Sequence, residues 1–300
     1  SVPDDLAGIF DAVKRAALIH QKGGGTGFSF SALRPEGDRV ASSGGVASGP
    51  VSFMSLLNAA TEVVKQGGKR RGANIGVLRV DHPDIRKFIR CKQESGRFSN
   101  FNLSVSLTDG FMEAVRADKT YPLINPRTGM TVAMPLAREI LHEMATAAWT
   151  TGDPGALFID TINKHNPTPH IGEIKACNPC GEIPLLDGEC CILGSVNLPV
   201  FVDGKGQTDW ERLEKAIRTA VRMLDNAIES TVYVDLESER ITKANRKIGL
   251  GVMGLADYLV LKGARYGSAE SLRSVSELME FINMEAGRAS ENLAMNRGSF

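Results

Sequence analysis

The sequence predicts an α/β protein. Stretches with the apolar spacing of amphipathic helices alternate with short stretches typical of strands, and glycine or proline separates many of them. Of the 300 residues, 42% are hydrophobic and 23% are charged, which is an ordinary composition for a globular protein. A chain of this length can bury a sizeable core, as one large domain or as two.

Charge and hydropathy exclude several classes of partner. The formal net charge is zero, so no broad basic surface suggests nucleic acid or an anionic membrane. No apolar run is long enough to span a bilayer, and the start lacks the charged-then-apolar layout of a signal peptide. Cysteines clustered at one place in such a chain indicate reduced thiols. We therefore expect a cytoplasmic protein that binds neither nucleic acid nor membrane.

Two amphipathic helices are predicted in the first quarter of the chain. The first covers residues 6–22, after Asp4 and Asp5, and the second covers residues 52–66, before the glycine pair at 67–68. Their apolar positions follow helical spacing, namely Leu6, Ile9, Phe10, Val13 and Ala17 in the first, and Phe53, Leu56, Leu57, Ala60, Val63 and Val64 in the second.

Three segments around these helices could contact a ligand. Residues 23–27 are glycine-rich but match neither a Walker A loop nor a dinucleotide-binding fingerprint, so a structural turn explains them equally well. Residues 42–50 form a second run of small residues. The basic run Lys69-Arg70-Arg71, between glycines, suits an anion-contacting loop or a solvated turn.

The rest of the chain continues the alternation. We predict strands at residues 75–80 and 101–107, a short buried strand at 156–159 and a glycine-broken buried strand at 248–254. Helices are predicted from apolar positions at residues 136–147, 210–229 and 272–282.

Four of the five cysteines fall within residues 176–198: Cys177, Cys180, Cys190 and Cys191. The unit Asn178-Pro179-Cys180-Gly181 predicts a constrained turn that presents one thiol between an amide and the carboxyl of Glu182. A zinc site is disfavoured, because a proline splits the first pair and adjacent cysteines rarely bind one tetrahedral ion. Inert buried thiols suit Cys91, Cys177 and Cys190, whereas a catalytic thiol beside an acid–base carboxyl suits Cys180.

The pattern Asn178-x-Cys180-x-Glu182, followed by Cys191-x-Leu-Gly-Ser-x-Asn-Leu198, resembles the finger loop of the ribonucleotide reductase catalytic subunit, most closely its adenosylcobalamin-dependent branch. The resemblance covers nearly the whole chain and implies part of a ten-stranded α/β barrel with a central finger loop. Within residues 1–300, residues 1–80 would form specificity-site helices and loops, and residues 176–198 the finger loop. We expect a fragment, truncated at both ends and inactive alone.

The resemblance implies radical-based reduction of ribonucleotides to 2′-deoxyribonucleotides. A thiyl radical on Cys180 would abstract the 3′ hydrogen, Glu182 would accept the 3′-hydroxyl proton, and Asn178 would hold the substrate hydroxyls. Cys191 would be the reductant, paired with a cysteine that precedes Ser1. The substrate contacts implied are Gly25, Asn178, Pro179, Cys180, Gly181 and Glu182, and no metal ligand is implied.

Control by a deoxynucleoside triphosphate at a dimer interface is also implied. Residues 42–48 and 69–74 match the two specificity loops, and the implied effector contacts are Asp4, Asp5, Leu6, Arg34, Lys69, Arg70 and Arg71. The two N-terminal helices would pair across a two-fold axis of a homodimer. The resemblance further implies adenosylcobalamin as cofactor and a thioredoxin- or glutaredoxin-type reductant.

Two alternatives stay open. One is a reductase whose radical comes from a diiron partner subunit, and whose relay tyrosines would lie outside this chain. The other is a nucleotide-binding regulatory module without turnover.

Overall fold

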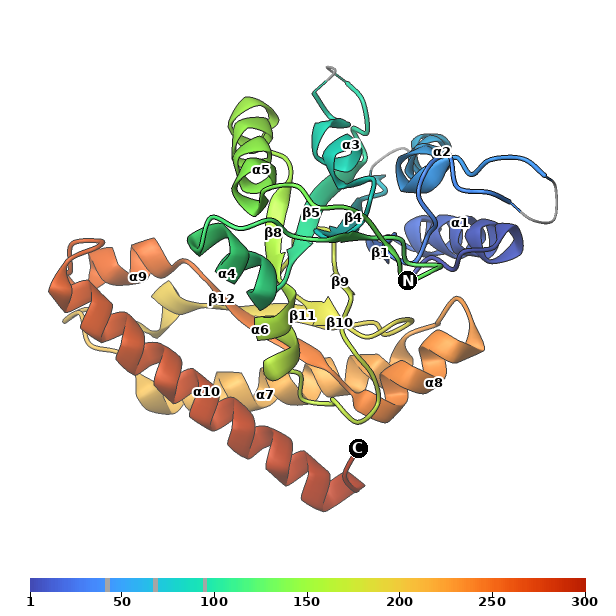
Figure 1. Ribbon diagram of the computed structural model, residues 1–300. Coiled ribbons are helices and arrows are strands. Elements are labelled where there is room, and N and C mark those ends of the chain that lie inside the picture. Colours follow the sequence, from blue (N-terminus) through green and yellow to red (C-terminus); the bar gives the residue numbers. More distant parts are fainter. Residues whose placement is uncertain (41–43, 67–69, 94–95) are drawn as a thin grey trace. The chain divides into compact units, whose positions relative to one another are not determined.

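A computed structural model describes residues 1–40, 44–66, 70–93 and 96–300 (Figure 1). The chain divides into two compact units, Ser1–Asp187 and Gly188–Phe300. Each unit has its own buried apolar core and is described by itself.

A parallel sheet organises the first unit. Its strands are β1 (Thr26–Ser29), β4 (Asn74–Arg79), β5 (Phe101–Leu107) and β8 (Gly155–Phe158), hydrogen-bonded in the order β1-β4-β5-β8. All three pairings are parallel. Parallel neighbours need crossover connections, and helices supply most of them. The α/β prediction is confirmed.

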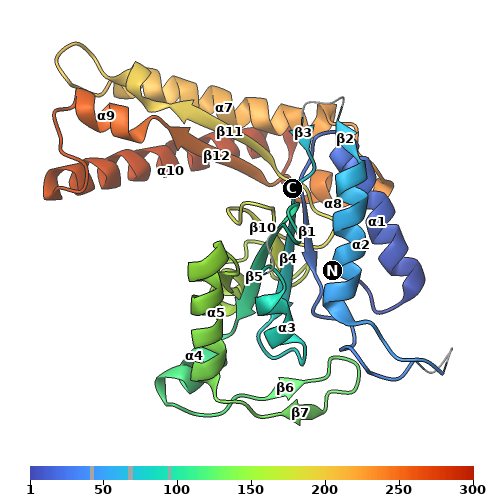
Figure 2. The ribbon, with the colours of Figure 1, turned by 90° about the horizontal axis from the view of Figure 1, so that it is seen from above.

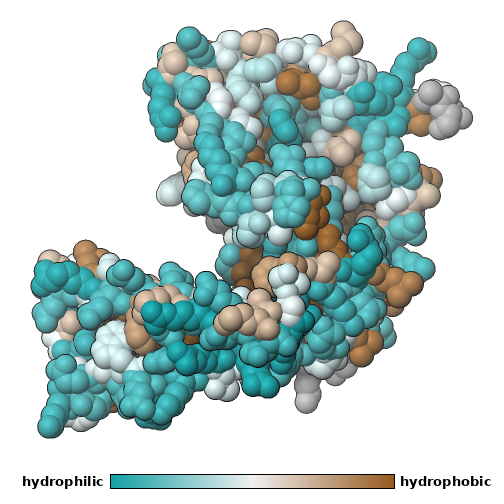
Figure 3. All heavy atoms as spheres, turned by 90° about the horizontal axis from the view of Figure 1, so that it is seen from below, coloured by the Kyte–Doolittle hydropathy of each residue, from teal (hydrophilic) through white to brown (hydrophobic). Residues whose placement is uncertain are grey.

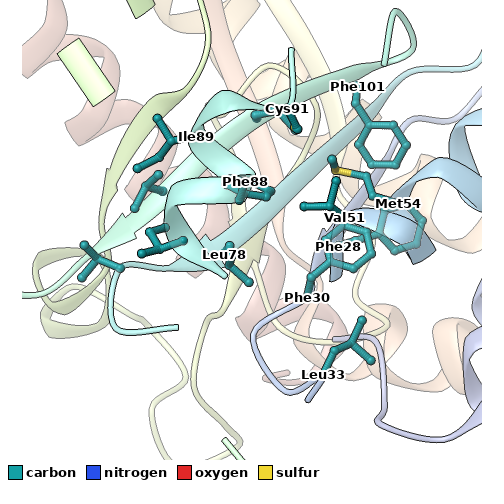
Figure 4. Packing of buried hydrophobic residues seen from close by; sticks show 14 of the residues in the cluster. Phe28, Phe30, Leu33, Val51, Met54, Leu78, Phe88, Ile89, Cys91 and Phe101 are labelled. Atoms are coloured by element: carbon teal, nitrogen blue, oxygen red, sulfur yellow. The ribbon is translucent and has the colours of Figure 1, made fainter. Parts of the chain in front are cut away.

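Helices pack on one face of this sheet and form the main core with it (Figures 1 and 2). Figure 4 shows aromatic residues at its centre, where the rings of Phe28, Phe30 and Phe101 lie with centroids 6.0–6.4 Å apart. The helices of the unit are α1 (Leu6–Gln21), α2 (Gly49–Val63), α3 (Ile85–Arg90), α4 (Asp109–Arg116), α5 (Ala137–Thr151) and α6 (Ile159–Lys164).

The other face of the sheet carries a short hairpin made of β9 (Ala176–Cys177) and β10 (Pro184–Leu185). Because strand side chains alternate between faces, Ile75 and Val77 point away from the helices and pack with Cys177 of the hairpin. This small second core holds the cysteine-bearing turn against the sheet.

Two further hairpins complete the unit. Strand β2 (Lys65–Gln66) pairs antiparallel with β3 (Arg70–Arg71), and β6 (Leu123–Ile124) pairs with β7 (Thr131–Ala133). The first hairpin corrects the predicted helix at 52–66. Helix α2 ends at Val63, because residues 65–66 extend to pair with the basic segment.

The second unit is built on two parallel strands, β11 (Ile192–Asn197) and β12 (Ile248–Met253). Helix α7 (Trp210–Ser230) packs on both strands, and the long helix α10 (Ala269–Arg297) packs on α7. The apolar stripe predicted for α7 is confirmed, since Leu213, Ile217, Val221, Leu224 and Ile228 are all buried. The remaining elements are η1 (Leu198–Phe201), α8 (Leu236–Asn245) and α9 (Leu255–Leu261).

Some details refine or correct the prediction. On α1, Ile9, Ala16 and His20 are buried, whereas Leu6 and Phe10 of the predicted apolar face are 65% and 53% exposed in the single chain. The buried strand predicted at 156–159 is wrong in its burial, because β8 (Gly155–Phe158) is mostly exposed. Within the segment 176–198, residues 176–177 and 184–185 form the hairpin β9–β10 and residues 192–197 form β11.

Within the described ranges, no helix is both long and apolar enough to cross a membrane. Figure 3 shows a face covered mainly by hydrophilic residues, with smaller groups of apolar residues between them.

Candidate active site

The turn that joins β9 to β10 is closed by its own hydrogen bonds. The Gly181 N–H donates to the Asn178 carbonyl (2.9 Å), and the Ile183 N–H donates to Asn178 Oδ1 (2.9 Å). Gly181 has φ +86°, a conformation that glycine adopts without strain. Cys180 at the tip is exposed, and so is Glu182. The turn uses Asn178 Oδ1, which makes Nδ2 the part of this amide suited to donate to a ligand.

Two glycines of the first strand region let the turn approach the sheet. A Cβ on Gly25 would lie 2.7 Å from Pro179 Cγ, and a Cβ on Gly27 would lie 1.8 Å from the Cys177 carbonyl oxygen. Both positions therefore need glycine. The glycine-rich segment thus lies directly against the cysteine-bearing turn, which sequence spacing alone did not show.

Strand β5 adds a contact that the sequence analysis missed. Asn102 Nδ2 donates a hydrogen bond to the Pro179 carbonyl oxygen at 2.7 Å. Asn102 lies 77 positions from Pro179 in the chain, and only the alternation within 101–107 hinted that it faces away from the core.

The five cysteines, all within the described residues, differ in environment, and Cys180 is the exposed one. Burial raises the pKa of Cys177 to about 11, and the nearby Glu182 carboxylate adds to this. Burial likewise raises the pKa of Cys91 to about 12. Since thiolates are the reactive form in polar chemistry, Cys91 and Cys177 are inert structural thiols at neutral pH.

The segment that carries Cys190 and Cys191 begins the second unit. The Glu189 side chain is fully buried and forms an ion pair with Lys247 Nζ (2.8 Å) while accepting from Asn245 Nδ2 (2.8 Å). The Cys190 N–H donates to Thr242 Oγ1 (3.0 Å). The end of α8 and the residues that follow it therefore hold the backbone just before Cys191. A single glutamate beside two cysteines has no local pattern that indicates burial, so the sequence did not predict the buried ion pair of Glu189.

No group of three or more His, Cys, Asp or Glu side chains that could hold a metal ion occurs in the part of the chain that the structure describes.

Two of the residues predicted to contact an effector, Arg34 and Asp4, form hydrogen bonds with each other. Arg34 Nε donates to Asp4 Oδ2 (2.8 Å), and the Arg34 N–H donates to Asp4 Oδ1 (3.0 Å). Asp5 caps α1 by accepting from the Gly8 N–H (2.8 Å), and Leu6 is exposed. Arg70 and Arg71 form β3. Lys69 lies outside the described residues, as do positions 42 and 43 of the first predicted loop.

The base of that first loop is held by an ion pair. Arg127 donates to both carboxylate oxygens of Asp38, and Asn125 Nδ2 donates to Oδ2. These hydrogen bonds, led by the one from Arg127, lower the pKa of Asp38 to about 2. Asp38 stays charged at any physiological pH and ties the loop base to the hairpin β6–β7.

A chain of buried polar side chains links α1, β1, β4 and α2. His20 Nε2 contacts Thr26 Oγ1 (3.0 Å), Thr26 Oγ1 donates to Asn74 Oδ1 (2.7 Å), and Asn74 Nδ2 donates to Thr61 Oγ1 (3.0 Å). Burial lowers the pKa of His20. A Cβ on Gly72 would lie 2.7 Å from the His20 ring, so glycine is required at this position too.

Comparison with known proteins decides the family. A family model described as the ribonucleotide reductase barrel domain matches residues 1–300. The chain belongs to this family. The resemblance found in the sequence is thereby confirmed.

Relatives of this chain are named as ribonucleoside-diphosphate reductases. It is 48% identical to a vitamin B12-dependent ribonucleoside-diphosphate reductase of Thermoplasma acidophilum, over all of this chain and 39% of the relative. It is 49% identical to a reductase of the same name from Mycobacterium tuberculosis strain CDC 1551, over all of this chain and 43% of the relative. A ribonucleoside-diphosphate reductase subunit alpha of Chlamydia trachomatis is 30% identical, over all of this chain and 32% of the relative. The chain thus spans about two fifths of the length of the first two.

Proposed function

We propose that the full-length protein containing this chain reduces ribonucleotides to 2′-deoxyribonucleotides for DNA synthesis, with Cys180 as the residue that reacts with substrate. The observation that carries the proposal is an exposed thiol on a closed turn, flanked by Asn178 and Glu182 and seated on Gly25. Membership of the reductase barrel family supports it. The names of the Thermoplasma and Mycobacterium relatives favour a ribonucleoside diphosphate as substrate.

Each residue of the turn has a role in this reaction. Cys180, as a thiyl radical, takes the hydrogen atom from C3′, so that an S–H bond forms as the C3′–H bond breaks. Glu182 accepts the 3′-hydroxyl proton, and Asn178 Nδ2 donates to the substrate. The 2′-hydroxyl leaves as water with a proton from the reducing cysteine pair, and the hydrogen atom held by Cys180 returns to C3′ at the end of the turnover, which restores the thiyl radical. Cys191 and a cysteine outside this chain supply two electrons and become a disulfide, which a thioredoxin- or glutaredoxin-type protein then reduces.

A cofactor must oxidise the Cys180 thiol to the radical, because no protein side chain does so unaided. The exposure of Cys180 fits this requirement, since a buried thiol would be closed to an external hydrogen-atom acceptor. When bound, adenosylcobalamin would supply a carbon-centred radical to this thiol. The vitamin B12-dependent names of the Thermoplasma and Mycobacterium relatives, which are more similar to this chain than the Chlamydia subunit alpha, favour it over a diiron partner subunit.

A direct assay tests the proposal. Full-length protein would be incubated with a ribonucleoside diphosphate, a dithiol and adenosylcobalamin, and the deoxyribonucleotide would be quantified by chromatography. Ribonucleoside triphosphates in a parallel series would identify the preferred substrate. Product that needs a diiron protein instead of the cobalamin would assign the other radical source. Absence of product under both conditions would contradict the proposed function and favour a regulatory nucleotide-binding module.

We also propose that a deoxynucleoside triphosphate regulates the protein near Asp4 and Arg34, in a cytoplasmic homodimer. Helices α1 and α2 pack against each other and leave Leu6, Phe10 and Val63 exposed. A second copy of this helix pair would cover these apolar side chains. Arg70 and Arg71 stay proposed effector contacts on the grounds of their charge, which suits phosphate.

Arg34→Ala is expected to weaken deoxynucleoside triphosphate binding about ten- to a hundred-fold, or roughly 1.5–3 kcal/mol. The change removes a cation and also leaves the half-buried Asp4 carboxylate to repel phosphate. Calorimetric titration with dTTP or dATP, with light scattering to follow dimers, measures the effect. Arg138→Ala is the matched control, because Arg138 pairs with Asp118 in an exposed ion pair on the same unit. Equal affinity of wild type and Arg34→Ala would show that the effector site lies elsewhere.

A further inference from the structure

Asn102 occupies a place from which it can control the reactive turn. It is the second residue of β5, a strand hydrogen-bonded on both sides, to β4 and to β8. Its neighbours Phe101 and Leu103 are buried in the helix-covered core, so Asn102 points to the opposite face, where the hairpin β9–β10 lies. An internal strand is among the most rigid supports that a fold offers.

The hydrogen bond of Asn102 reaches the backbone directly beside Cys180. Asn102 Nδ2 donates to the Pro179 carbonyl oxygen at 2.7 Å, and this carbonyl belongs to the peptide that joins Pro179 to Cys180. The plane of that peptide sets the direction in which the Cys180 side chain leaves the backbone. Pro179 itself is buried against Gly25, which blocks movement of the turn toward the sheet.

The other hydrogen bonds of the turn lie within the hairpin. They join Asn178 to Gly181 and to Ile183, and so fix the shape of the turn but not its orientation on the sheet. In the described part of the chain, Asn102 provides the one side-chain hydrogen bond that residues 178–182 receive from outside the hairpin.

We propose that Asn102 is a positioning residue for Cys180, one that aims its sulfur at the substrate by anchoring the Pro179–Cys180 peptide to the sheet. This proposal rests on the proposed role of Cys180. Hydrogen transfer requires the reacting atoms at about 3–3.5 Å, and a misplacement of about 1 Å can lower a rate about a hundred-fold. An amide suits the task because it donates a hydrogen bond without bringing a charge beside the reacting centre.

Kinetics of full-length variants test this role. Asn102→Ala and the isosteric Asn102→Asp both remove the donor, and the second also sets a carboxylate against the Pro179 carbonyl. We expect kcat to fall about ten- to a hundred-fold in each, with KM within about twofold of wild type, because geometry rather than affinity is lost. Asn296→Ala is the control, since Asn296 Nδ2 also donates to a backbone carbonyl (2.8 Å) but on the exposed surface of α10. Unchanged kcat in Asn102→Asp, or a change in KM alone, would overturn the proposal.

A second measurement does not depend on activity. The rate at which iodoacetamide alkylates Cys180, followed by mass spectrometry of the peptide, reports how firmly the turn is held. We expect Asn102→Asp to raise this rate several-fold while Asn296→Ala matches wild type. Equal alkylation rates in all three proteins would overturn the positioning role. If wild type forms no deoxyribonucleotide, the proposed function fails, yet the alkylation rates still decide whether Asn102 anchors Cys180. If Asn102→Ala does not fold, Asn102→Asp alone is sufficient for both the kinetic and the alkylation measurements.

Discussion

Replacing Cys180 by serine in the full-length protein is expected to abolish deoxyribonucleotide formation, with a loss of about a thousand-fold or more, equivalent to about 4 kcal/mol of transition-state stabilisation. Serine has nearly the same shape, and the side chain is exposed, so the fold and effector binding should be unchanged. What is lost is the weak S–H bond, because a serine O–H bond is too strong to yield a radical under the same conditions. Product would be measured by chromatography and effector affinity by calorimetry.

Cys190→Ser is the control for that variant. Cys190 lies next to Cys191, and a disulfide between adjacent cysteines is strained, so Cys190 is not expected to act as the reductant. This variant should keep most of its turnover, and thiol counting after one turnover should still show loss of the Cys191 thiol. Measurable turnover by Cys180→Ser would contradict the radical assignment, and a Cys190–Cys191 bridge would contradict the role given to Cys191.

Lys247→Met is expected to destabilise the second unit by about 3 kcal/mol. The Glu189 carboxylate is fully buried and Lys247 is 15% exposed, so the change removes a cation that directly pairs with a buried negative charge. Hydrogen exchange in β11 and β12, followed by mass spectrometry, measures the free energy of local opening in this unit. Because Glu189 directly precedes the cysteine pair, exchange should rise at residues 189–192 as well.

Lys215→Met provides the matched comparison. Lys215 pairs with Glu211 on α7, with both side chains more than 70% exposed, and exposed pairs contribute at most about 1 kcal/mol. The double variant Glu189→Gln with Lys247→Met should recover much of the lost stability, because it removes both buried charges. Similar exchange in Lys247→Met and Lys215→Met would show that the buried pair does not stabilise this unit.

Local patterns in the sequence predicted most of the secondary structure. The stripe on α7 and the strand at 101–107 follow from periodicity, which depends only on near neighbours. The end of α2 was misplaced because the glycine pair at 67–68 is a weaker determinant than the pairing of β2 with β3. Leu6 and Phe10 belong to the predicted apolar face of α1 yet are exposed in this chain, because a periodic pattern does not tell which side chains a neighbouring element will cover.

The same limit of local sequence patterns explains which parts of the candidate site could be predicted. Proline, glycine and asparagine fix the Cys180 turn locally, and the sequence predicted that turn. The contact from Asn102 joins residues 77 positions apart, and the ion pair between Glu189 and Lys247 joins residues 58 positions apart. Neither has a local signature, so both became visible only when the chain was folded.

Protection of Cys180 by substrate tests the central claim most directly. Full-length protein would be alkylated with iodoacetamide in the presence and absence of a saturating ribonucleoside diphosphate, and the labelling of each cysteine compared by mass spectrometry. If the turn at 178–182 holds the ribonucleotide, Cys180 labelling should fall at least about tenfold, while the labelling of the buried Cys91 and Cys177 should not change. Unchanged labelling of Cys180 in a protein that is saturated with ribonucleotide and forms product would contradict the account.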